Sequence, residues 1–170
     1  MTISSKELAR SKIEKLVKRY SESIKRDFTE QDKITNFILP FFESLGWNIY
    51  DVYEVKQEGY PRNFTRSLPV ERRAIDKPDC VISLNGKPYI VLEFKSLHYG
   101  RNVDRYASQV EKLLGKAEYL NVKHAVLTSF AETVVYDRTS EKQLIDFSDP
   151  TEYLSKFEEL WKHLSKEGAA

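Results

Sequence analysis

Two apolar segments joined by the dipeptide Asn85-Gly86 constrain this chain more than any other feature of its sequence. Residues 79–84 and 88–95 are rich in Val, Ile and Leu, and Asn-Gly between such segments is a strong signal of a β-hairpin. The outer ends of both predicted strands nevertheless carry carboxylates, Asp79 on the first and Glu93 on the second. Charges beside a core are costly unless they are paired or bind a metal. The hairpin is therefore expected to carry a site as well as part of the core.

The loop length decides whether the two carboxylates meet. A two-residue loop that pairs Leu84 with Lys87 puts Asp79 and Glu93 on opposite faces of the hairpin. A three-residue loop, or a bulge, puts Asp79 opposite Glu93 with Cβ atoms ~5 Å apart. We predict this second register, because it satisfies the core and the site together. One face then holds only apolar residues, Cys80, Ile82, Leu84, Ile90, Leu92 and Phe94, and the other holds Asp79, Ser83, Tyr89, Glu93 and Lys95.

This arrangement is typical of a site for a hard cation. Two adjacent carboxylates favour Mg²⁺, with Mn²⁺ as a substitute. Lys95 follows Glu93 on the same strand face, where an ammonium can orient an attacking water and offset charge developing on a phosphate. Metal and lysine together suit hydrolysis of a phosphodiester. A carboxylate on a helix could complete the site, and Glu30 is the candidate.

The Glu-x-Lys triplet alone carries little weight in a chain with 31% charged residues. A second copy, Glu54-Val55-Lys56, also lies on a predicted strand. Solvated surface is the ordinary explanation of such a triplet. What distinguishes Glu93-Phe94-Lys95 is Pro78-Asp79 on the preceding strand, facing it across the hairpin.

The remaining periodicities predict an α/β fold around one mixed sheet. Thr29 is the expected N-cap of the second helix, Pro40 is expected to bend it, and Gly46 to end it. We expect residues 1–28 to form an N-terminal helix, 29–147 the core, and 148–170 a C-terminal helix with a weakly structured tail, all in one domain. The predicted helices cover residues 5–27, 29–45, 103–117 and 153–164, and the further strands cover 47–58, 124–129 and 133–136.

Composition narrows the class of protein. The longest apolar runs are far too short to span a bilayer, and we expect no membrane association. A single cysteine, Cys80, excludes a disulfide scaffold and suits a reducing cytoplasm. The 27 basic and 26 acidic residues leave a net charge of +1, which argues against a protein that binds nucleic acid through its overall charge alone.

At Pro78-Asp79 and Glu93-Phe94-Lys95 the sequence resembles the PD-(D/E)xK nuclease superfamily, and the resemblance extends over roughly residues 29–165. It implies a restriction-endonuclease-like core of order α-β-β-β-α-β and Mg²⁺-dependent cleavage of DNA. The narrower likeness is to the N-terminal nuclease domain of type I restriction R subunits and of type IIG restriction-modification enzymes. That likeness implies a prokaryotic, cytoplasmic restriction system whose methyltransferase, helicase or target-recognition parts are supplied elsewhere. It also implies supporting roles for Glu30 on the first helix and Gln109 on the helix after the motif.

Four arginines near the predicted site are candidates for phosphate contacts with DNA: Arg66, Arg72, Arg73 and Arg101. Two alternatives remain open. One is another nuclease of the superfamily, such as a repair nuclease or junction resolvase. The other is a nuclease-like fold kept as a binding module, although such a module has no need of Asp79, Glu93 and Lys95 together.

Overall fold

The computed structural model describes residues 2–23, 28–61, 77–95 and 103–170, with side chains from residue 106 onward in the last range. Its centre is one six-stranded mixed sheet in which spatial order follows chain order. Every neighbouring pair of strands is antiparallel except β3 and β4, which are parallel. The α/β class with a mixed sheet is therefore confirmed. The strands are β1 (Val55–Gln57), β2 (Cys80–Leu84), β3 (Lys87–Phe94), β4 (His124–Thr128), β5 (Thr133–Asp137) and β6 (Gln143–Phe147).

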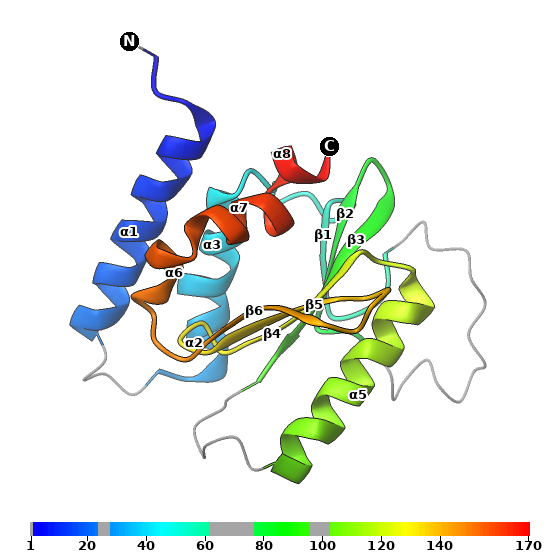
Figure 1. Ribbon diagram of the computed structural model, residues 1–170. Coiled ribbons are helices and arrows are strands. Elements are labelled where there is room, and N and C mark those ends of the chain that lie inside the picture. The colour runs from blue at the N-terminus through cyan, green and yellow to red at the C-terminus, as the bar shows by residue number, and fades with distance from the viewer. Residues whose placement is uncertain (1, 24–27, 62–76, 96–102) are drawn as a thin grey trace.

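Helices cover both faces of the sheet and make three layers (Figure 1). Among the described residues, the long helix α5 (Val103–Leu120) is the helix that covers one face of the sheet, and it makes the crossover between β3 and β4. The N-terminal and C-terminal helices share the other face, so both ends of the chain pack into one core. They are α1 (Ser5–Ser23), α2 (Glu30–Lys33), the π-helical turn η1 (Ile34–Ile38), α3 (Leu39–Ser44), α6 (Glu152–Ser155), α7 (Phe157–Leu164) and α8 (Lys166–Ala169).

The second helix begins and is interrupted for identifiable reasons. Thr29 is its N-cap, as predicted, in a capping box with Asp32. Pro40 has no N–H to give to the carbonyl of Asn36, and the helix takes the wider π-helical path through η1 just before it. The guanidinium of Arg19 on α1 donates to the Asn36 carbonyl instead. Gly46 follows the helix with φ 98°, a conformation that glycine adopts without strain.

The hairpin of β2 and β3 has the predicted pairing but reaches it by a bulge. Leu84 pairs with Lys87 across a two-residue turn, so the three-residue loop was the wrong alternative. Tyr89 is the extra residue, because Ser83 pairs with Pro88 whereas Ile82 pairs with Ile90. The shift continues to the pair of Cys80 with Leu92, which places Asp79 opposite Glu93, as predicted.

Each face of the hairpin packs against a different helical layer. The predicted apolar set, from Cys80 to Phe94, packs with α1, α3 and the C-terminal helices. Val81 and Val91 point to the opposite face and pack against α5. Tyr89 was predicted on the carboxylate face, and that is wrong. As the bulged residue it turns toward Trp47, with ring centroids 6.1 Å apart.

Three other expectations about secondary structure were wrong. The predicted strand 47–58 is reduced to β1, because the side chains of Asn48 and Asp51 accept hydrogen bonds from the main chain two residues ahead and form turns. The edge strand β6 was not predicted. The expected weakly structured tail is helical in α8, where the Ser165 hydroxyl accepts from the Gly168 N–H.

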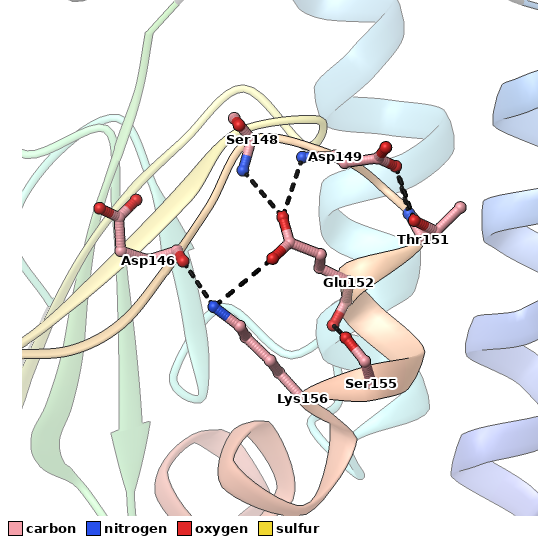
Figure 2. A network of polar contacts seen from close by, with 7 residues as sticks. All are labelled: Asp146, Ser148, Asp149, Thr151, Glu152, Ser155 and Lys156. Atoms are coloured by element: carbon pink, nitrogen blue, oxygen red, sulfur yellow. Dashed lines mark hydrogen bonds and ion pairs between the residues drawn. The ribbon is translucent and has the colours of Figure 1, made fainter.

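A polar network fixes the junction between β6 and the C-terminal helices (Figure 2). Glu152 accepts from the main-chain N–H groups of Ser148 and Asp149, and the Asp149 carboxylate accepts from Thr151. Lys156 lies within 3.6 Å of Glu152 and donates to the Asp146 carbonyl at 2.7 Å. This network stabilises the turn after β6, from which the chain continues into the C-terminal helices on the sheet face opposite α5 (Figure 1).

None of the helices among the described residues combines the length and the hydrophobicity that crossing a bilayer requires.

Candidate active site

A cavity of about 380 Å³ lies between the ends of β2 and β3 and the face of α5. It is predominantly polar, and four lysines and two carboxylates contribute to its wall. Of the residues predicted for the site, Asp79, Glu93, Lys95 and Gln109 all line it. The described residues that line it are Lys77, Asp79, Glu93, Lys95, Ser108, Gln109, Lys112, Lys116 and Leu127.

Asp79 is held in place by the main chain on both sides. Its carboxylate Oδ2 accepts the N–H of Phe94 at 2.8 Å, which ties it to the end of β3. Its carbonyl accepts the N–H of Glu58 at 2.8 Å, and the Pro78 carbonyl accepts that of Gly59 at 3.0 Å. These bonds extend the pairing of β1 and β2 by one step. The side chain is thereby fixed beside Glu93.

Glu93 is a buried carboxyl group of the cavity. Only 5% of the residue is exposed. Burial is the main reason why its pKa is raised to about 7, and a hydrogen bond to Asp79 and the charge of Asp79 act in the same direction. Lys116 opposes them, with Nζ 2.5 Å from Glu93 Oε1. Two carboxyl groups thus share one small volume, where repulsion between them favours a bound proton or cation.

Lys95 lies just beyond the end of β3, where its N–H donates to the Thr128 carbonyl of β4 at 3.1 Å. Its side chain contributes to two cavities, the one that holds the carboxylates and a smaller one of about 40 Å³. A flexible lysine side chain that lines the same cavity as the two carboxylates can contact a molecule bound there.

Glu30 lies in the smaller cavity with Lys33 and Lys95, and not in the wall of the larger one. The structure thus brings Glu30 near Lys95 but does not group it with Asp79 and Glu93. Glu30 is exposed at the first turn of α2, a position where a carboxylate also interacts favourably with the helix dipole.

The sequence reasoning missed two lysines of the cavity, Lys112 and Lys116. Both lie on α5, three and seven residues after Gln109, so the three side chains form one stripe along the helix. That spacing was the available signal. The spacing alone did not identify Lys112 and Lys116 as site residues, because it does not show that this stripe of α5 faces the carboxylates.

The other candidates lie elsewhere. Arg66, Arg72, Arg73 and Arg101 fall outside the described residues. In the second Glu-x-Lys triplet, Glu54 forms an ion pair with Lys166 of α8 at 2.7 Å, on the side of the molecule that holds the C-terminal helices. That carboxylate therefore has a structural partner outside the cavity.

The donor set of the cavity fits a hard divalent cation. Asp79 and Glu93 supply carboxylate oxygens to the same cavity, and burial together with the neighbouring Asp79 raises the pKa of Glu93, which is the environment that a bound cation would relieve. Within the described ranges, no group of three or more His, Cys, Asp and Glu side chains is arranged to hold a metal. Further ligands at this pair would have to be water, main chain or substrate oxygens.

Comparison of the chain with protein-family models, with curated proteins and with solved structures gave no match.

Proposed function

We propose that this chain is a metal-dependent DNA endonuclease domain of the PD-(D/E)xK type, the cleavage module of a restriction system. The observation that carries the proposal is the meeting of Asp79, Glu93 and Lys95 at one cavity. The order of elements from α2 through β1, β2, β3 and α5 to β4 supports the restriction-endonuclease-like core.

In this proposal the residues divide the work of hydrolysis. Asp79 and Glu93 would hold Mg²⁺, which supplies Lewis-acid chemistry and a water of lowered pKa when bound. Lys95 would orient the attacking water and offset negative charge that develops on the phosphate. Gln109 would hold that water or the scissile phosphate from the opposite wall of the cavity. The hydrogen bond from the Phe94 N–H fixes the Asp79 carboxylate before substrate binds, and the bond from the Lys95 N–H to the Thr128 carbonyl fixes the main chain that carries the Lys95 side chain.

The low net charge of the chain fits a nuclease domain that a partner domain or subunit brings to DNA. The chain has a net charge of only +1, and neutralisation of phosphates supplies most non-specific affinity for DNA. Four lysines line the cavity, so positive charge is concentrated where a scissile phosphate would lie. Binding to long DNA would then depend on a recognition domain or subunit.

The test is cleavage of supercoiled plasmid in Mg²⁺ or Mn²⁺. We expect nicked and linear products from the wild type and a loss of at least about a hundredfold in Asp79→Asn and in Lys95→Ala. Lys56→Ala is the matched control, because it removes the lysine of the second Glu-x-Lys triplet, which lies outside the cavity. Its cleavage rate should equal that of the wild type.

Two results would contradict the proposal. One is cleavage that persists unchanged in both Asp79→Asn and Lys95→Ala. The other is a wild type that neither cuts plasmid nor binds Mn²⁺ in calorimetry. A branched-DNA substrate in a parallel reaction separates a junction resolvase from a restriction-type cutter, since a resolvase would cut the branched molecule in preference to the plasmid.

A further inference from the structure

Lys116 forms the most buried ion pair among the described residues. Its ammonium lies 2.5 Å from Glu93 Oε1, and the side chains of Lys116 and Glu93 are only 13% and 7% exposed. The other ion pairs of the described chain join side chains that are more exposed. Lys116 therefore places a positive charge directly at the carboxylate pair.

A purely structural role accounts poorly for this pair. Buried ion pairs contribute little net stability, since the cost of removing two charges from water offsets their attraction. The packing of α5 on the sheet is already provided by its apolar residues Leu113, Ala117 and Leu120. Lys116 lies beside this apolar stripe and reaches the cavity instead. Its position is explained by the carboxylates, whose mutual repulsion it offsets.

The ammonium also has a second acceptor within reach. Its Nζ lies 3.3 Å from the main-chain carbonyl of Lys77, on the segment that leads into β2. A lysine has three N–H donors on a flexible stem, so Lys116 can leave Glu93 and stay hydrogen-bonded to this carbonyl. Departure from Glu93 would not leave a buried charge without a partner.

We propose that Lys116 is a built-in counter-ion of the carboxylate pair, and that a divalent cation binding to Asp79 and Glu93 must displace its ammonium from Glu93. The inference rests on the proposed metal site and adds a regulatory element to it. Lys116 neutralises the pair while the metal is absent, and the same charge lowers the affinity for the metal. Affinity is then set by a competition between an internal cation and an external one.

The experiment is calorimetric titration with Mn²⁺ at pH 8.5, which is above the pKa of about 7 of Glu93. We expect Lys116→Gln to bind Mn²⁺ at least about tenfold more tightly than the wild type, equivalent to about 1.4 kcal/mol. Lys116→Arg keeps the charge and should leave the affinity near that of the wild type. Lys112→Gln is the matched control on the same helix and cavity wall. Its exposed charge is screened by salt, and the affinity should change by less than about threefold.

The outcomes separate this inference from the proposed function. Unchanged or weaker Mn²⁺ binding by Lys116→Gln, with normal binding by the wild type, would overturn the counter-ion role and leave the metal site standing. Absence of binding in both proteins would overturn both proposals. Asp79→Asn should bind no Mn²⁺ in either background, which locates the heat at this site. Far-ultraviolet circular dichroism checks folding. If Lys116→Gln does not fold, Lys116→Met keeps the apolar stem and serves the same test.

Discussion

Two buried side chains, His124 and Glu93, make opposite contributions to the pH dependence of the free energy of unfolding. His124 begins β4 and is 1% exposed. Burial lowers its pKa from 6.5 to about 4, and the nearby charges of His163 and Lys123 act in the same direction. Burial likewise raises the pKa of Glu93 from 4.5 to about 7. The folded state therefore favours the uncharged form of both side chains.

The sign of each contribution follows from which state binds more protons. Between pH 6.5 and about 4 the unfolded chain protonates His124 and the folded chain does not, so stability from this group is lost as the pH falls. Between pH 7 and 4.5 the folded chain binds the extra proton at Glu93, so stability from this group is gained as the pH falls. At about 1.4 kcal/mol per pH unit, each contribution amounts to about 3 kcal/mol. In the wild type they nearly cancel.

Single substitutions should expose each contribution. Urea unfolding followed by tryptophan fluorescence, in EDTA and at pH values from 7.5 to 4.5, gives the free energy of unfolding of wild type and variant. Relative to the wild type, His124→Leu should gain about 3 kcal/mol as the pH falls over this range, and Glu93→Gln should lose about as much. His163→Gln, which alters a more exposed ring 5.2 Å from His124, should show a smaller change. Curves of His124→Leu that run parallel to those of the wild type would refute the reasoning.

Three further predictions concern the packing and capping of the fold. In the absence of metal, Lys116→Gln should lower the free energy of unfolding by about 3 kcal/mol, because it removes the ion-pair partner of the buried Glu93. The double variant that also carries Glu93→Gln should recover most of this loss, which a double-mutant cycle measures. Thr29→Ala should cost about 1 kcal/mol in urea unfolding, because the N-cap hydrogen bond is lost, whereas Thr29→Ser should cost little. Trp47→Phe should lower the melting temperature through a loss of about 3 kcal/mol, since the buried indole N–H donates to the Leu164 carbonyl at 2.7 Å; an unchanged melting temperature would show that this bond contributes nothing.

The part of the fold that local pattern determines was predictable from sequence. The hairpin register was predicted from the requirement that apolar residues share one face. Because the turn has two residues, the bulge at Tyr89 is what brings the strands into that register. The helix start at Thr29 followed from capping chemistry. In both cases the signal lies within a few residues, so no knowledge of the tertiary structure was needed.

The errors occurred where local and tertiary effects compete. Residues 47–58 alternate like a strand, but Asn48 and Asp51 bond to their own main chain, and Tyr50 remains 82% exposed. β6 lies at the edge of the sheet, and only its alternation of buried Ile145 and Phe147 marked it in the sequence. Edge strands need less hydrophobicity than central ones, which makes them hard to recognise.

The candidate site shows the same division. Asp79, Glu93 and Lys95 were found because they lie on one hairpin. Lys116 was missed because its relation to Glu93 depends on how a crossover helix packs on the sheet. The distance between those two side chains is a property of tertiary structure, and no spacing along the chain encodes it.

The parallel pairing of β3 with β4 also has a consequence for the order in which the molecule folds. Asp79 bonds to a residue 15 positions away within one hairpin, and hairpins form in about 1–10 μs. Lys116 reaches Glu93 only after a crossover helix has docked, and parallel pairing of that kind is slow because a long loop must close first. We therefore expect the two carboxylates to come together early, with their positive partner arriving in a later step of folding.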